Sequence, residues 1–268
     1  MFGIIALVVA LEGKKCRLTD VGGSPLGPFE LKDCVHLDLS ARALGDSGAK
    51  ELAAALKTNS KLETLDLYFN YIRDEGAIAL ADALRENSKL TKLTMESNSI
   101  GNEGATALGE MLKINKGLKG LYLKHNDISD LGAVGLAAGL KMNSVLTTLY
   151  LRRNSVDNEG AAALAEALKS SACTSLNLRR NRVGDEGALA LVAALPSTKV
   201  STLDLRYNDY TDKGKGALAG GASGGRKVLA TEPEKDAGKW RGKGGKDGRK
   251  MKPMKVQRGK RRPSAGAF

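Results

Sequence analysis

Lysine, arginine and tyrosine side chains recur at nearly constant intervals in the second half of the sequence. Two adjacent columns of them repeat every 27 or 28 residues, and tyrosines stand two positions earlier in two of the repeats. The residues are Tyr122, Lys124, Tyr150, Arg152, Arg153, Arg179, Arg180, Arg206 and Tyr207. Tyrosine and arginine are enriched at the energetic centres of protein interfaces. We therefore predict a docking site for an acidic protein surface or peptide; the alternative is a solvated face whose long side chains splay apart.

The same columns are acidic and aromatic nearer the N-terminus. Asp38 and Asp66 occupy the column of Tyr122 and Tyr150, and Glu96 occupies the column of Lys124. Tyr68 and Phe69 fill the two adjacent columns of one repeat. We predict a second contact point at Tyr68 and Phe69, although exposed aromatic residues without a binding role are common.

The interval itself points to the elements that position these side chains. A Leu-x-x-Leu-x-Leu pattern recurs, with its central leucine at Leu37, Leu65, Leu93, Leu121, Leu149, Leu176 and Leu203. The alternation predicts a short strand, and the following Gly-Ala-x-Ala-Leu pattern predicts a helix. Because no unit can bury its apolar face alone, the units must stack. Adjacent strands then lie about 4.8 Å apart, which brings the basic residues of successive units close together.

An asparagine follows each strand except the first, where Arg42 stands instead. The column is Asn70, Asn98, Asn126, Asn154, Asn181 and Asn208. A buried asparagine at a strand end can bond backbone groups of the adjacent units, so this column predicts a structural ladder.

Together these residues resemble the ribonuclease-inhibitor type of leucine-rich repeat, which also occurs in NOD-like receptors and Ran GTPase-activating proteins. The resemblance covers about residues 34–218, as roughly seven repeats of 27–28 residues. It implies an α/β solenoid, or horseshoe, with parallel strands on the concave face, helices on the convex face, and protein partners bound by the concave face.

Both ends depart from the pattern. Residues 3–11 align with the helix of a later repeat, so residues 1–33 are predicted to be a partial or degenerate repeat and a loop. Such a partial repeat would fit a fragment or a truncated gene model. The alternative for the apolar run is a signal or anchor segment. Residues 219–268 are rich in Gly, Lys and Arg and are predicted to be a disordered tail. Residues 213–268 hold 17 Lys/Arg and 4 Asp/Glu, a net charge of +13, so the overall charge of +12 describes the tail.

Catalytic motifs are missing from the sequence. Gly45-Asp46-Ser47-Gly48 resembles a serine-protease motif, but it occupies the turn into a repeat helix. Three widely spaced cysteines, Cys16, Cys34 and Cys173, argue against a disulfide framework or a zinc site. We predict no enzyme activity, no cofactor and no metal.

The sequence thus predicts an interaction scaffold or adaptor of the cytoplasm, with the nucleus as the alternative, that binds an acidic protein partner and no membrane. One alternative is a GTPase activator of the Ran type acting on a small GTPase, whose functional loop residues cannot be placed here. Another is RNA or nuclear association through weak nucleic-acid contacts of the basic tail.

Overall fold

Each interval of the sequence folds into one short strand, a turn and a helix. The computed structural model describes residues 5–12, 15–25, 34–221 and 225–230, with side chains described from residue 34 onward. The strands of the array are β3 (His36–Asp38), β4 (Thr64–Asp66), β5 (Lys92–Thr94), β6 (Gly120–Tyr122), β7 (Thr148–Tyr150), β8 (Ser175–Asn177), β9 (Thr202–Asp204) and β10 (Lys227–Leu229). The helices are α1 (Gly45–Thr58), α2 (Asp74–Glu86), α3 (Asn102–Ile114), α4 (Asp130–Met142), α5 (Asn158–Leu168), α6 (Asp185–Ala194) and α7 (Asp212–Gly221).

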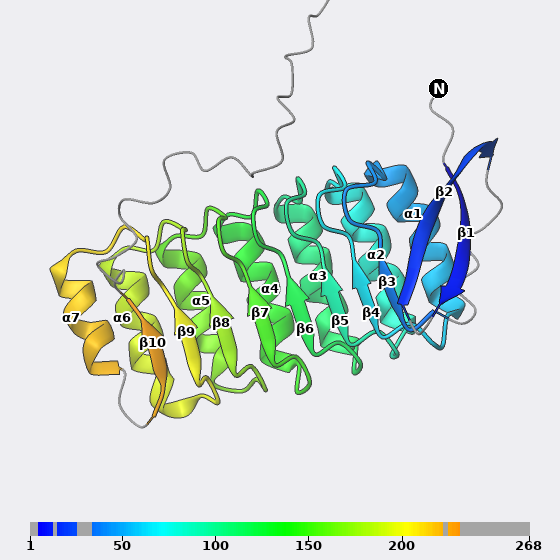
Figure 1. Cartoon of the computed structure of the whole chain (residues 1–268). Coiled ribbons are helices and arrows are strands. Elements are labelled where there is room, and N and C mark those ends of the chain that lie inside the picture. The colour runs from blue at the N-terminus through cyan, green and yellow to red at the C-terminus, as the bar shows by residue number, and fades with distance from the viewer. Residues whose placement is uncertain (1–4, 13–14, 26–33, 222–224, 231–268) are drawn as a thin grey trace, which may run out of the picture. The chain divides into compact units, whose positions relative to one another are not determined.

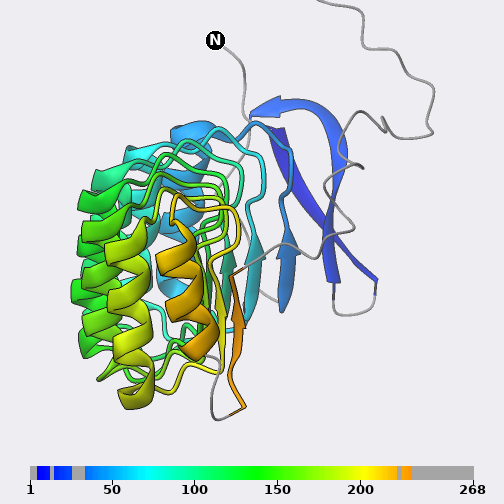
Figure 2. The ribbon, with the colours of Figure 1, turned by 90° about the vertical axis from the view of Figure 1, so that its left-hand side faces the viewer.

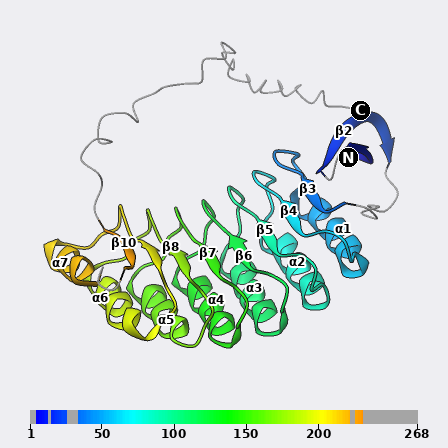
Figure 3. The same cartoon turned by 60° about the horizontal axis from the view of Figure 1, so that its bottom comes forward.

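The strands form one parallel layer in chain order, and the helices form a second layer behind it (Figures 1 and 2). The central leucines are paired in register, from Leu37 with Leu65 to Leu176 with Leu203. These leucines are buried, together with the apolar side of every helix, in one continuous core. Figure 3 shows the strand layer on the inner, concave side of the array. The predicted α/β solenoid is confirmed.

The asparagine column joins neighbouring repeats through buried backbone groups. The Nδ2 of Asn98 donates to the carbonyl oxygens of Leu67 and Met95 at 2.9 and 3.1 Å, and its Oδ1 accepts from the N–H of Asn70 and Ile72 at 3.0 Å each. The same pattern recurs to Asn208, which bonds the carbonyl oxygen of Leu178 in the previous repeat.

A second ladder, which the sequence analysis missed, joins the C-terminal ends of the helices. Its members lie 28 residues apart: Asn59, Asn87, Asn115 and Asn143. Asn115, for example, donates to the carbonyl oxygens of Leu84 and Asn87 at 2.6 and 2.8 Å, and accepts from the N–H of Leu118. These asparagine side chains therefore bond carbonyl groups at the helix ends that have no partner within the helix.

A third column, of Asp and Asn residues, caps the N-terminus of the helix in the next repeat. The same contact explains the recurring glycine. The Oδ1 of Asp74 accepts from the N–H of Gly101 and Gly104 in the next repeat, at 2.7 and 2.9 Å. A Cβ on Gly104 would lie 2.8 Å from that oxygen, so the close approach requires glycine. Asp46 of the protease-like motif does the same for Gly76, which gives this motif a structural role.

Substituting Asp74 tests this cap. Asp74→Ala removes the acceptor of two N–H groups, so we expect it to lower the free energy of unfolding by about 1–2 kcal/mol. Asp74→Asn should stay within about 0.5 kcal/mol of wild type, because Asn102 and Asn158 already make these bonds through an amide oxygen. Urea denaturation of both variants measures the difference, and equal losses would contradict the assignment.

The structure corrects the expected helix over residues 3–11. Ile5–Glu12 is strand β1, paired antiparallel with β2 (Lys15–Pro25), which in turn runs parallel to β3. The β-branched residues of this run (two Ile and two Val within residues 4–9) favour a strand as well as a buried helix, so the alignment with a repeat helix was misleading. The division at residue 33 stays a prediction.

The array also continues beyond the predicted boundary at residue 218. Helix α7 reaches Gly221, and β10 adds a parallel strand to the edge of β9. Tyr210 stands in the column that holds Ile or Val in other repeats, and its hydroxyl bonds the carbonyl oxygens of Leu205 and Ala230. Burial, and the charge of Asp204, raise the pKa of Tyr210 to about 12, so this contact persists at all physiological pH values. Residues 222–224 and 231–268, most of the predicted tail, lie outside the described residues.

The cysteines differ from the expectation in one respect. Cys34 is disulfide-bonded, whereas Cys173 is a free, buried thiol. Burial raises the pKa of Cys173 to about 11, so it carries very little thiolate at neutral pH. The wide spacing of the cysteines therefore did not exclude a disulfide at Cys34.

Candidate functional site

The basic residues of the last repeats meet on the concave face, at the ends of β7, β8 and β9. Backbone bonds continue past the strands, because the N–H of Arg153 donates to the carbonyl oxygen of Arg179 and that of Arg180 to Arg206, each at 2.9 Å. Four half-buried side chains, Arg152, Arg153, Arg179 and Arg180, therefore lie on adjacent repeats. We call these four residues the arginine cluster.

Tyr207 holds two members of the cluster. The guanidinium carbons of Arg179 and Arg180 lie 4.5 and 4.6 Å from the centre of its ring. Such cation–π contacts occupy the face of a guanidinium and leave its N–H edge available for hydrogen bonds.

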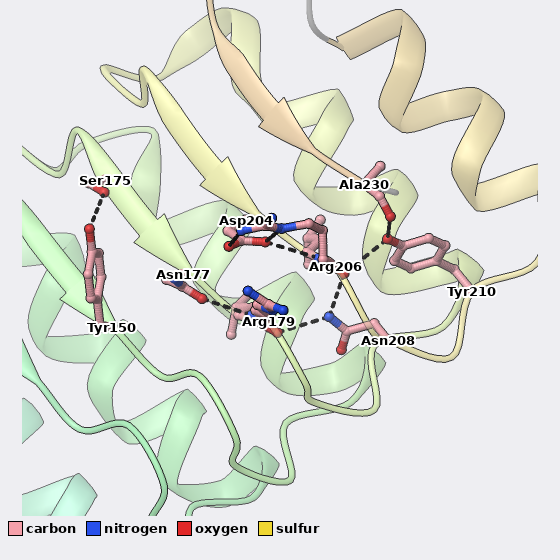
Figure 4. A network of polar contacts seen from close by, with 11 residues as sticks. Tyr150, Ser175, Asn177, Arg179, Asp204, Arg206, Asn208, Tyr210 and Ala230 are labelled. Atoms are coloured by element: carbon pink, nitrogen blue, oxygen red, sulfur yellow. Dashed lines mark hydrogen bonds and ion pairs between the residues drawn. The ribbon is translucent and has the colours of Figure 1, made fainter. Parts of the chain in front are cut away.

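Arg206 lies beside the cluster but is engaged within the protein. Its Nη2 and Nε bond the two carboxylate oxygens of Asp204 at 2.7 and 2.9 Å (Figure 4). Asp204 is only 4% exposed, so the carboxylate depends on this partner. Asp204 is thus paired with Arg206, and among the described residues it forms no ion pair with a member of the arginine cluster.

The charge of the cluster is uncompensated. Among the described residues, none of its four members forms an ion pair, and the Nε groups of Arg152, Arg179 and Arg180 are covered yet have no hydrogen-bond partner. Burial lowers the pKa of the Arg152 guanidinium, and so do the charges of Arg179, Arg153 and Arg180, while Asp204 partly opposes them. An anion bound by the exposed part of these half-buried side chains would relieve the repulsion between them.

The predicted basic row is consequently shorter in the structure. Lys124 forms an ion pair with Glu96 at 3.3 Å, so its charge is balanced within the array. Tyr122 and Tyr150 pack edge to face with their ring centres 5.1 Å apart, and Lys92 lies over the Tyr122 ring. These tyrosines form an uncharged surface next to the arginine cluster.

The second predicted contact lies on the repeat of β4, apart from the arginine cluster. Tyr68 and Phe69 are 41% and 45% exposed, and Tyr71, which the sequence analysis missed, is 57% exposed. The Phe69 ring lies 6.1 Å from that of Tyr68 and 5.3 Å from that of Tyr71, so the three form one exposed aromatic group.

One backbone feature of the second column was also missed. The residue before each ladder asparagine, and Ala41 before Arg42, has a positive φ of 54–61°. These residues are Ala41, Phe69, Ser97, His125, Arg153, Arg180 and Tyr207. No glycine marks the column, so the sequence carries no local signal for this left-handed conformation, which the stacked repeats impose.

The described part of the chain contains no group of three or more His, Cys, Asp or Glu side chains placed to hold a metal ion. None of its helices combines the length and apolar character needed to cross a membrane.

The fold and its concave face define a solenoid built from stacked strand–helix repeats. The family model described as leucine-rich repeat matches residues 58–81, 86–109, 115–137, 143–165 and 174–192. The chain is a leucine-rich-repeat protein. Its sequence matches no curated protein. Among solved structures it is similar to Leiomodin-1 Actin-Binding Site 2, with 22% sequence identity and a TM-score of 0.45 over 48% of this chain and 78% of that one.

Proposed function

We propose that this protein is a non-enzymatic interaction scaffold or adaptor that binds an acidic protein segment on its concave face. The observation that carries the proposal is the arginine cluster, whose four adjacent guanidinium groups form no ion pair within the described part of the chain. Leucine-rich-repeat proteins are typically binding scaffolds, which supports the same function. The tyrosines beside the cluster would contact the uncharged part of the partner, and the residue types match those enriched in interface centres.

Charge reversal tests this proposal. Arg152→Glu with Arg179→Glu should reduce capture of partner proteins at moderate salt by at least about tenfold, because it turns attraction into repulsion at the contact. The matched control is Arg73→Glu with Arg85→Glu, which reverses two exposed arginines on another repeat, one just before α2 and one in its last turn. Quantitative mass spectrometry of material retained by the full chain and both variants gives the comparison. Equal retention by all three would show that the cluster is only a solvated face.

The other predicted functions stay predictions, since no specific observation favours them. GTPase activation has no residues assigned to it, and the segment predicted to contact RNA lies almost wholly outside the described residues. Cytoplasmic or nuclear localisation likewise remains a prediction.

A further inference from the structure

The arginine cluster has properties that discriminate between anions. Three of its members, Arg152, Arg179 and Arg180, lie on adjacent repeats and form no ion pair with the described residues. Their Nε atoms are covered, so a ligand must bind the exposed ends of the guanidiniums, and one anion shared by three of them must offer several acceptor oxygens.

A carboxylate meets this requirement poorly. It has one negative charge and two oxygens, which a single guanidinium fork can occupy, as Asp204 and Arg206 demonstrate within this chain. A phosphate monoester has about −1.5 to −2 charges and three strong acceptor oxygens, so it can bond more than one guanidinium at once.

The stacking on Tyr207 favours the same ligand. Because Arg179 and Arg180 both lie against this ring, their side chains are ordered before any ligand binds. Less side-chain entropy is then lost when an anion is bound, and the N–H edges are the parts left to contact it.

The surroundings limit the length of the anion. The cluster covers the ends of two adjacent strands, β7 and β8, which lie about 5 Å apart at the usual strand spacing. Toward the N-terminus the concave face continues with the balanced pair Lys124–Glu96 and then with Asp66 and Asp38. A long polyanion lying along the strand ends would meet these acidic residues, whereas a single phosphate on a polypeptide would not. The tyrosines Tyr122 and Tyr150 offer a surface for the neighbouring peptide residues.

We propose that the arginine cluster binds a phosphorylated serine or threonine of the partner protein, with Arg152, Arg179 and Arg180 bonding the phosphate oxygens. This inference rests on the proposed function and names the chemical group that the concave face recognises.

The test uses the full chain and three labelled peptides of neutral flanking sequence, with phosphoserine, glutamate or serine at the centre. Fluorescence anisotropy at moderate salt should show the phosphoserine peptide binding about tenfold more tightly than the glutamate peptide. Arg179→Gln with Arg180→Gln should abolish this preference. Arg73→Gln with Arg85→Gln should retain it, and because this control keeps the basic tail and removes the same charge, it accounts for attraction by the tail.

A second variant guards against a loss of folding. Arg179→Lys with Arg180→Lys keeps the charge but removes the planar fork and its stacking, so the preference for phosphoserine should fall about tenfold while thermal unfolding stays near that of wild type. Wild-type preference in this variant would overturn the inference.

The outcomes separate the two proposals. If both anionic peptides bind equally and the glutamine variant loses both, the site takes carboxylates, so this inference fails and the proposed function stands. If the glutamine variant binds both peptides as wild type does, both proposals fail. If a short single-stranded RNA binds more tightly than the phosphopeptide and loses affinity only in the glutamine variant, the site is one for nucleic acid and the inference is wrong.

Discussion

Replacing Gly139 by alanine should lower the free energy of unfolding by about 3 kcal/mol, although the same change at an open helical site is usually stabilising. Helices α3 and α4 approach each other through Gly109, Gly135 and Gly139. A Cβ on Gly139 would overlap the carbonyl group of Gly109, because it would lie within 3.0 Å of it, a distance that real Cβ atoms essentially never show. The obstacle is backbone, which cannot rotate away as a side chain can, so the two helices must separate and lose contact along their length.

The matched control is Gly216→Ala in α7. A Cβ there meets nothing within 4 Å, and the φ of Gly216 is not positive. Alanine should therefore stabilise this helix by about 0.5–1 kcal/mol, through its smaller loss of backbone entropy on folding. Chemical denaturation of both variants measures two changes of opposite sign. A destabilisation at Gly139 no larger than about 0.5 kcal/mol would mean that the helices can move apart freely.

Much of this architecture could be predicted because the residues that determine it recur at a regular interval in the sequence. The leucines alternate as in a strand, the alanines and leucines that follow have helical spacing, and the recurrence at 27–28 residues implies stacking. The second ladder of asparagines has the same 28-residue spacing, so its signal was present. It was overlooked because an asparagine after a helix also fits an ordinary helix end.

Features at the ends of the array lack that support. The strand β1 and the strand β10 each occur once, so no repetition distinguishes them from a helix or a tail. The role of Tyr210 depends on a contact with Ala230, which only the folded chain brings close. Where the pattern is interrupted, short apolar segments fit more than one structure, and the neighbouring element decides between them.

The candidate site shows a different limit of sequence reasoning. The basic columns could be recognised by spacing alone, but the spacing does not tell which charges are already paired. Lys124 is balanced by Glu96 in the previous repeat, and Arg206 by Asp204 two residues earlier in the chain. Only after these pairs are removed does the arginine cluster emerge as the uncompensated part of the row.

Arg42 in the asparagine column has a simple explanation. A ladder asparagine donates its amide hydrogens to the repeat before it. In the described residues no strand–turn–helix repeat precedes β3, whose neighbour is β2 of the antiparallel pair β1 and β2. The N–H of Arg42 is itself bonded by the Oδ1 of Asn70 at 2.9 Å, so the ladder begins one repeat later. The exception thus falls on the first described repeat of the array.

In the middle of the ladder, Asn98→Ala should lower the free energy of unfolding by about 3 kcal/mol. The side chain is buried, and its removal leaves the N–H groups of Asn70 and Ile72 without their acceptor and the carbonyl groups of Leu67 and Met95 without this donor. Each buried polar group left unsatisfied costs about 1–3 kcal/mol, and water can reach only some of them. Asn98→Ala removes four hydrogen bonds, whereas Asp74→Ala removes two, so the loss of stability should be larger for Asn98→Ala.

Position in the array provides the control. Ser99→Ala changes the exposed neighbour of Asn98 and should stay within about 0.5 kcal/mol of wild type. Asn208→Ala removes a ladder member at the last repeat, where the side chain is less buried and water can replace part of its bonding, so an intermediate loss is expected. Urea denaturation should show the largest loss of stability for Asn98→Ala, an intermediate loss for Asn208→Ala and the smallest for Ser99→Ala. If Asn98→Ala were no more destabilising than Ser99→Ala, the stacked leucines alone would hold the repeats together, and the asparagine column would serve only to shape the turn.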